Sequence, residues 1–477
     1  MKTMKYFVVG ALLSISATSM AQDVNYNTAL EPISKAMKEN PAAVEKMAKA
    51  YISQFKKDPQ ALISLGSAYL AVRNFDKADE IADMVIAKSK KDMTAQSEAY
   101  ILKGDIEAVK DQQGDGGAAA SHYATAMSLD PKNPQGYMRY AAVYRSISPK
   151  IVEDTYAKLR QERPDFPIDA EAGHSFFSGG KFAKAFENYA KCNMNQLEED
   201  KLVEYLIAAF QTSKYADASK IASFGGNKFA KNATFAQLGM WSAVENKNFN
   251  EALTTAQRFF AMEGDKNATD HTYYGKAFLG AEKYTEALAQ FNKALEVNAD
   301  ATEPLAKISE TYMKMGNEDT ALEYSEKYMQ KNKNASPSDY ANLAGIYTAK
   351  ADKGIDPATN YNKAINIYDQ MGAKFPVIAS WANMIAAGIA DKSGNTDLGA
   401  SYNQKIVDEL YNKANRDSDE TGYLIQALRL LGFHYWSDKN DLEAAKPYYE
   451  MLIKLDPADK NARAALGLDQ EAPAASE

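Results

Sequence analysis

Small and aromatic residues recur along this chain at helical spacings, and the whole pattern returns about every 34 residues. Within each period the apolar positions follow one another at intervals of three and four, which is the spacing of one face of an α-helix. The strict alternation that is typical of a β-strand is missing. The pattern therefore predicts two helices per period, and it is clearest at Gly275, Phe278, Tyr284, Ala287, Phe291 and Ala294.

The same arrangement is found near both ends of the chain and in its middle. The period that starts near residue 58 predicts a first helix with Gly66 and Tyr69 on one stripe, a turn at 73–75, and a second helix that contains Ala78 and Ala82. Two further clear copies contain Gly173, Phe176, Phe182, Ala185, Tyr189 and Cys192, and Gly432, Tyr435, Ala445, Tyr449 and Pro457.

The small residues have a physical role in this pattern. Where two helices cross closely, a side chain larger than Ala pushes the helix axes apart, and such overpacking costs about 1–3 kcal/mol. The aromatic residues fill the wider gaps between the helices. Prolines such as Pro131, Pro164, Pro376 and Pro457 follow the second helix, where they end one element before the next begins.

The small residue early in the first helix, the aromatic three residues later, the Ala in the second helix and the closing Pro together resemble the tetratricopeptide repeat. The resemblance extends over about residues 58–468 and amounts to about eleven repeats. It implies an all-α fold, a right-handed superhelix of helix pairs, in which the first helices line the concave side. Two segments, 111–117 and 351–362, are expected to be insertions that lengthen the turn of their repeat.

The two ends of the chain depart from the repeat. Lys2 and Lys5 precede an apolar run and a small-residue stretch that ends at Ala21, which predicts a signal peptide at 1–21 and an exported protein. We expect an N-terminal helical cap at 22–57, the tandem array at 58–457, a C-terminal capping helix at 458–468 and a disordered tail at 469–477. The expected location is the periplasm, with secretion as the alternative.

Composition limits the kinds of partner. The chain has 55 basic and 63 acidic residues, and removal of Lys2 and Lys5 takes its formal net charge from −8 to about −10. Nucleic-acid binding requires a concentrated cationic face, and no long Lys/Arg run supplies one. Apart from the apolar run near the start, no window is apolar enough to predict a transmembrane segment. The single cysteine, Cys192, occupies a repeat position that is Ala elsewhere, which favours a packing role.

Three local patterns suggest chemistry but do not meet its requirements. The run 114–119 imitates a dinucleotide-binding turn but lies between two predicted helices, without the strand that such a turn follows. Asp417, Asp419 and Thr421 imitate a calcium loop, yet Leu428 stands where the bidentate acid is needed. The four histidines lack the paired spacings that zinc prefers. We therefore expect no metal, no cofactor and no enzymatic activity.

The exposed stripe of the first helices is the expected binding surface, because the resemblance places these helices on the concave side. Its side chains are a mixture of aromatic, methionine and polar groups, which suits an amphipathic segment of another protein. The Lys and Asn clamp with which some members of this family hold a carboxylate is not found. The residues counted onto this stripe are Met138, Arg145, His174, Phe177, Thr272, Lys276, Leu279, Glu303, Glu310, Met313, Lys314, Gln426, Arg429, Phe433 and Trp436.

The sequence thus predicts an exported scaffold that holds a segment of a partner protein, with peripheral association with an envelope or secretion complex. Its signal peptide and aromatic-rich repeats are similar to those of exported repeat proteins of Bacteroidota. The alternative is a glycan-capture protein associated with the outer membrane, because some carbohydrate binders contain a few such repeats and Tyr and Trp can stack on sugars. The near-complete coverage by repeats, and the absence of a lipidation cysteine after Ala21, disfavour this alternative.

Overall fold

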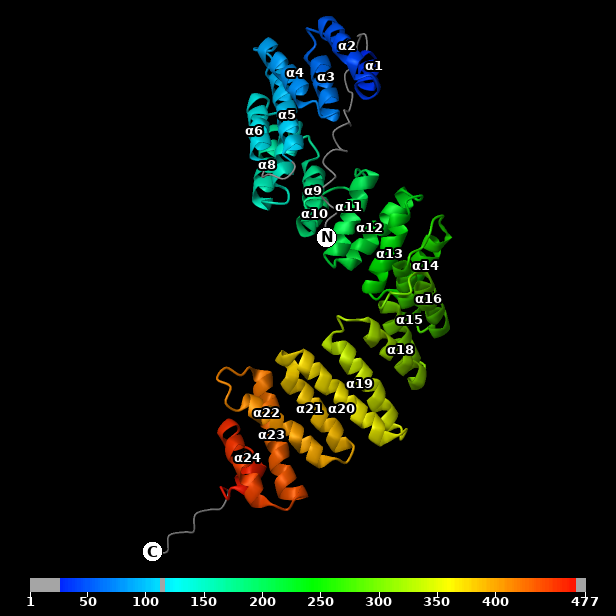
Figure 1. The fold of residues 1–477 in the computed structure, drawn as a ribbon, viewed down its shortest axis with the longest axis vertical. Coiled ribbons are helices and arrows are strands. Elements are labelled where there is room, and N and C mark those ends of the chain that lie inside the picture. Colours follow the sequence, from blue (N-terminus) through cyan, green and yellow to red (C-terminus); the bar gives the residue numbers. More distant parts are fainter. Residues whose placement is uncertain (1–25, 112–115, 469–477) are drawn as a thin grey trace, which may run out of the picture. The chain divides into compact units, whose positions relative to one another are not determined.

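The computed structural model describes residues 26–111 and 116–468 of the 477, and within these ranges the chain forms helices joined by short turns, with no β-strand (Figure 1). The predicted all-α fold class is confirmed over these residues. The predicted signal peptide and the predicted tail lie outside the described residues, as does most of the predicted insertion at 111–117.

The chain divides into two compact units, Met1–Asn246 and Lys247–Glu477. The boundary falls in the turn between α13 and α14, inside one of the predicted repeats. The helices of the first unit are α1 (Tyr26–Glu39), α2 (Pro41–Gln54), α3 (Pro59–Ala71), α4 (Phe75–Lys88), α5 (Met93–Lys110), α6 (Gly117–Leu129), α7 (Pro134–Tyr144), α8 (Pro149–Glu162), α9 (Ile168–Ser178), α10 (Phe182–Tyr189), α11 (Glu199–Gln211), α12 (Tyr215–Lys228) and α13 (Ala233–Glu245).

The second unit continues the same alternation of helices. It contains α14 (Phe249–Ala261), α15 (Ala268–Gly280), α16 (Tyr284–Val297), α17 (Glu303–Lys314), α18 (Glu318–Lys331), α19 (Pro337–Asp352), α20 (Pro357–Lys374), the 3₁₀ turn η2 (Pro376–Ile378), α21 (Ala379–Lys392), α22 (Thr396–Leu410), α23 (Ser418–Phe433), the π-helical turn η3 (His434–Asp438), α24 (Leu442–Leu455) and α25 (Lys460–Ala465).

Each unit is a linear stack. From α3 to α13, and again from α14 to α25, every helix packs against the next one along the chain. The buried apolar residues accordingly form a series of local clusters rather than one centre, for example around Leu65, Phe176, Ala386 and Leu428. This is the core of a repeat solenoid, in which each pair of helices is stabilised by its neighbours. We call the first helix of each pair, α3 to α23 in odd numbers, the A helix and the second the B helix.

Asp and Asn side chains begin many of these helices. Asp58, Asn74, Asp92 and Asn248 each accept a hydrogen bond from a backbone N–H in the first turn of the helix that follows. These caps satisfy amides that have no partner within the helix, and each contributes about 1 kcal/mol. The start of each of these four helices is therefore specified by the residue that precedes it.

One prediction about the turns is wrong in extent. The segment 351–362 lengthens the turn of its repeat by only one residue relative to the turn 281–283, because α19 continues to Asp352 and α20 begins at Pro357. The extra residues lengthen the two helices, and Tyr361 and Ala364 are buried in the core of α20. Apolar residues at helical spacing inside the segment allow it to stay helical, and Pro357 occupies the first helical position, where a missing N–H costs nothing.

Candidate protein-binding surface

Successive A helices lie side by side within each unit. In the first unit α3 contacts α5, and the same contact links α5 to α7, α7 to α9, α9 to α11 and α11 to α13. In the second unit it joins α15 to α17 and α21 to α23. The A helices thereby form a continuous wall within the first unit, and the sides of these helices that no B helix covers form its surface. We call this surface the A face, and we use the same name for the uncovered sides of the A helices in the second unit.

Glycines in the A helices set the distance to the B helices. A Cβ atom placed on Gly275 would lie 2.4 Å from Phe291, and one on Gly432 would lie 2.5 Å from the ring of Tyr449. Gly173 approaches Tyr189 in the same way, at 2.9 Å. These three A helices therefore rest directly on an aromatic ring of their own B helix, as the small-residue argument predicts.

Polar side chains connect neighbouring A helices. Arg139 Nε on α7 donates to Asp105 Oδ1 on α5 at 2.7 Å, and Lys276 Nζ on α15 lies 3.4 Å from Glu303 Oε1 on α17. Tyr123 also donates to Asp105, which is buried. Burial of this carboxylate raises its pKa, whereas Arg139 opposes that rise. These bridges link α7 to α5 and α15 to α17.

A group of ionisable side chains lies between α9 and α11. His174 Nδ1 is 2.9 and 3.0 Å from the two carboxylate oxygens of Glu204, and the buried Tyr189 hydroxyl donates to the same carboxylate. One turn earlier Lys201 pairs with Glu171. The hydrogen bond to Glu204 is the main cause that raises the pKa of His174, and burial opposes it.

In the first unit, the four predicted binding residues lie on α7 and α9. Met138 and Phe177 are partly buried and pack against the core, and the ring of Phe177 contacts Phe182 edge-on at 5.5 Å. His174 keeps 42% of its side chain exposed although it is held by Glu204. Arg145 is partly buried at the end of α7, and burial lowers the pKa of its guanidinium. Within this group His174 is therefore the polar residue presented to solvent in a fixed orientation.

Five predicted residues of the second unit lie on α15 and α17 and reach the surface to different degrees. Glu303, Glu310 and Lys314 are exposed, whereas Lys276 and Met313 are partly buried. Glu310 accepts a hydrogen bond from Lys307, and the ammonium of Lys276 lies 4.2 Å from the centre of the Tyr273 ring. The charges of this region are thus largely paired within the chain.

Two predicted residues do not project from the A face. Thr272 and Leu279 are only 2% and 7% exposed. The Thr272 hydroxyl donates to the carbonyl of Ala268 one turn back, and Leu279 belongs to the cluster around Phe291. Their assignment to the exposed stripe is wrong, because α15 is covered over a wider arc than the single stripe that was counted from Gly275.

The four predicted residues of the last repeat include the most open aromatic group. Gln426, Arg429 and Phe433 are exposed along one side of α23, and Phe433 is 52% exposed. Arg429 is held by Asp456 and Asp459, at 2.5 and 2.6 Å. Trp436 is half-buried against Tyr449. These residues come together, and Phe433 is the one among them that offers an unpacked apolar surface.

Some residues of the A face were not identified from the sequence. Glu204 and Lys201 lie 30 residues after the groups that they bind, and this regular spacing of opposite charges on consecutive A helices is a signal that could have revealed them. Gly345, Gly388 and Gly422 are exposed helical glycines, and a Cβ placed on any of them meets nothing within 4 Å. These glycines stand at other positions of the repeat than the glycines that pack against a B helix, so the repeat position distinguishes exposed glycines from packed ones.

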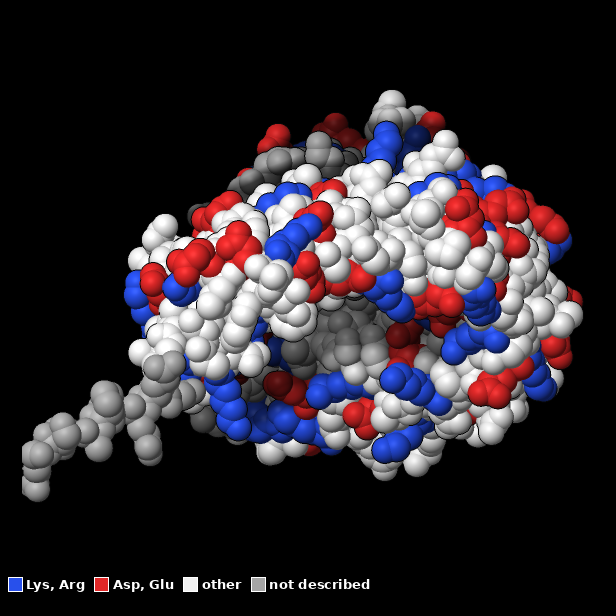
Figure 2. Space-filling view, turned by 90° about the horizontal axis from the view of Figure 1, so that it is seen from below, with Lys and Arg blue, Asp and Glu red and all other residues white. Residues whose placement is uncertain are grey.

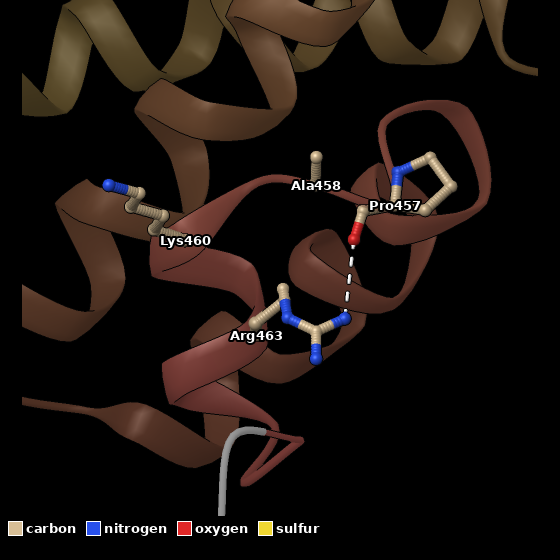
Figure 3. Close-up of a pocket in the computed structure, with 4 residues that line it drawn as sticks. All are labelled: Pro457, Ala458, Lys460 and Arg463. Atoms are coloured by element: carbon tan, nitrogen blue, oxygen red, sulfur yellow. Dashed lines mark hydrogen bonds between the residues drawn. The ribbon is translucent and has the colours of Figure 1, made fainter.

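A shallow pocket of about 640 Å³ lies at the C-terminal end, lined by Pro457, Ala458, Lys460 and Arg463 (Figure 3). The Arg463 guanidinium donates to the carbonyl oxygen of Pro457 at 3.4 Å and to that of Leu468 at 3.3 Å, so it closes the end of α25. On the face drawn in Figure 2, basic and acidic side chains are interspersed. The face drawn in Figure 2 therefore lacks the single-sign field that a polyanion requires.

Among the described residues, no group of three or more His, Cys, Asp or Glu side chains is arranged to hold a metal ion. In the same ranges, no helix combines the length and apolarity needed to cross a bilayer. Cys192 is partly buried, and burial raises the pKa of its thiol to about 11. The thiol is therefore protonated at neutral pH and packs among apolar neighbours.

Comparison with known proteins agrees with the geometry. The family model described as tetratricopeptide repeat matches residues 430–459, which span the end of α23, η3 and α24. The resemblance predicted from the sequence is thus confirmed for this repeat. A search of curated proteins finds no significant match.

Three solved structures illustrate what the chain is similar to. The C-terminal part of a TPR repeat-containing protein from Cytophaga hutchinsonii is 18% identical, with 55% of this chain and 99% of that chain covered and a TM-score of 0.46. PilF of Pseudomonas aeruginosa is 16% identical, with coverages of 45% and 93% and a TM-score of 0.34. Cut9–Hcn1 of the APC/C is 13% identical, with coverages of 93% and 90% and a TM-score of 0.28.

Proposed function

We propose that this protein is an exported, non-enzymatic scaffold that holds a segment of a partner protein on its A face. The observation that carries the proposal is the wall of A helices, which in the first unit runs without interruption from α3 to α13. Stacked helix pairs present such an extended surface at little energetic cost, because their stability comes from contacts between neighbouring pairs. An extended polypeptide segment fits this surface better than a small molecule.

The proposal extends to location and process. The signal sequence predicted at 1–21 supports export to the periplasm of a bacterium similar to the Bacteroidota. A soluble scaffold in that compartment would assemble cell-envelope or secretion machinery. The balanced distribution of charge favours a partner segment of mixed character, in which apolar anchors meet groups such as Phe433 and Phe177.

Crosslinking and co-purification test the proposal. The mature chain from residue 22 onward is immobilised, incubated with a periplasmic extract and treated with a short amine-reactive crosslinker. A Gln426→Ala/Phe433→Ala variant of the A face is treated in the same way. A Glu450→Ala variant is the control, because Glu450 is an exposed residue of the B helix α24. We expect a protein that the wild type and the control retain and the double variant loses.

Two results would contradict this expectation. One is equal recovery of every captured protein by all three forms, which would show that the exposed side of α23 takes no part in binding. The other is the absence of any specific capture together with clear retardation of the protein in polysaccharide gels, which would instead indicate a glycan-binding protein.

A further inference from the structure

His434 lies in an unusual turn of the last repeat. The five residues His434–Asp438 form a π-helical turn at the end of α23, a geometry that is rare and is often found at functional positions. The side chain of His434 is only 8% exposed, and its two ring nitrogens face different carboxylates. Nε2 is 3.2 Å from Asp397 Oδ1 at the start of α22, and Nδ1 is 3.2 Å from Asp438 Oδ2 within the turn itself.

This arrangement distinguishes the two protonation states of the imidazole. A neutral imidazole has one N–H, so one of its nitrogens must direct a lone pair at a carboxylate oxygen. An imidazolium has two N–H groups and can donate to both carboxylates. The cation therefore makes two attractive contacts, whereas the neutral ring makes one attractive and one repulsive contact.

The other charged groups around His434 strengthen this distinction. Asp391 at the end of α21 also acts electrostatically on the ring, and Lys439 beyond the turn pairs with Asp397 at 2.5 Å. Three carboxylates thus face one ammonium and the imidazole. Without the proton on His434 the group has an excess of two negative charges, and with the proton an excess of one.

Two predicted binding residues lie at this turn. Phe433 directly precedes His434, and Trp436 lies within the π-helical turn, against Tyr449. We propose that His434 is a proton-operated lock: its cation ties η3 to the start of α22, and loss of the proton releases the turn that positions Phe433 and Trp436. The lock regulates the proposed binding surface. Only this regulatory role rests on the proposed function.

Hydrogen exchange of the full-length protein measures the lock directly. Imidazole groups change charge between about pH 5 and 8, so exchange is compared at pH 5.5 and pH 8.0 after correction for the intrinsic rates. Amides of residues 434–439 and of the first turn of α22 are expected to lose protection by about tenfold or more at pH 8.0, because a hydrogen bond to a charged group contributes on that order. In a His434→Gln variant we expect low protection at both pH values.

Controls separate the lock from general effects of pH. His271→Gln removes a histidine of the same unit whose partner is the neutral amide of Gln290, and this variant should keep the response of the wild type. If His434→Gln does not fold, Asp397→Asn takes its place with the same expected result. Unchanged protection of the wild type between the two pH values, or an equal fall in His434→Gln, overturns the lock. No partner is used, so such a failure leaves the scaffold proposal standing.

Discussion

Two glycines of a single helix, α23, differ in what surrounds them. Gly432 lies against the ring of Tyr449, where a Cβ would approach to 2.5 Å, whereas Gly422 is exposed with nothing within 4 Å. We expect Gly432→Ala to destabilise the second unit by about 1–3 kcal/mol through overpacking. Gly422→Ala should stabilise it by about 0.5–1 kcal/mol, because Ala loses less conformational freedom in a helix.

Chemical unfolding followed by helical circular dichroism measures both variants. Changes of equal sign would show that the environment of the glycine does not decide the outcome, and would contradict the close contact between α23 and α24.

Glu98 on α5 provides a test of electrostatics at a single residue. Burial raises the pKa of this carboxyl from its ordinary 4.5 to about 7, although it accepts a hydrogen bond from Gln60 Nε2 at 2.6 Å. Because the folded protein favours the protonated form, the stability associated with this group is fully present below about pH 4.5 and is lost as the pH rises through about 7. Glu98→Gln should therefore raise the melting temperature more at pH 8 than at pH 5.

Glu45→Gln is the matched control. Glu45 is exposed, and its hydrogen bond with Lys49 lowers the pKa of its carboxyl, so its substitution should give no gain at pH 8. A gain for Glu98→Gln that is the same at both pH values would show that the ionisation of Glu98 is not coupled to folding.

At the scale of the element, the turn between A and B helices repeats one backbone conformation. The residue at its left-handed position has a φ of 59° at Arg73, 58° at Ser213 and 60° at Glu282, and glycine occupies it at Gly180 and Gly316. A side chain in this region costs about 1–2 kcal/mol, which glycine avoids. The amino acid at this turn position therefore varies between repeats, whereas its backbone conformation is constant.

Glu282→Gly should stabilise the second unit by about 0.5–1 kcal/mol, because relief of the backbone strain exceeds the entropy that glycine adds to the unfolded chain. The reverse change, Gly316→Ala, should destabilise it by a similar amount or more, since φ is 74° there. Thermal melts of the two variants decide the matter, and a loss of stability in Glu282→Gly would be incompatible with this turn geometry.

Much of the element level could be predicted from the sequence for identifiable reasons. Gly275 and Phe291 stand at spacings that only a packed helix pair explains, and Asp and Asn caps lie immediately before the helices that they begin. The lengths of α19 and α20 could not be predicted, because their extra residues keep a helical pattern and the repeat length alone assigned them to a turn. The exposed side of α15 was also misjudged at Thr272 and Leu279, since the width of a helix's covered arc depends on neighbours that a period does not specify.

The candidate surface was less predictable than the fold. Phe433 and Gln426 emerge as expected, but the partners of His174 and Arg429 come from other helices, and nothing local in the sequence indicates that these residues are held. Whether a polar side chain on an A helix is open or paired is decided by the charge on the next repeat, which helical counting within one repeat does not use.

At the scale of the whole molecule, the linear stack predicts that damage stays local. Ala287 is fully buried between α15 and α16, so Ala287→Leu should overpack that junction by about 1–3 kcal/mol. Because each pair is stabilised only by its neighbours, we expect faster hydrogen exchange in α14–α18 and unchanged exchange from α3 to α11. A uniform loss of protection throughout the chain would instead indicate one cooperative core.

Lys276→Ala is the control for this experiment. Lys276 lies in the same repeat and is partly buried, with its ammonium near Glu303 and over the ring of Tyr273, but its loss leaves the packing of Gly275 on Phe291 intact. It should alter exchange less than Ala287→Leu, because truncation here removes contacts without overpacking the junction. Equal effects of the two substitutions would contradict the assignment of Ala287 to the junction.

The packing of Gly275 and Gly432 against aromatic rings also constrains how such a chain can grow or be recombined. The contact of Gly275 with Phe291, or of Gly432 with Tyr449, requires both residues. A recombination point inside a helix pair would therefore separate the aromatic ring from the glycine against which it packs. Gene duplications and engineered chimaeras of this protein should therefore succeed when they are joined between pairs, in the segment that leads from a B helix to the next A helix.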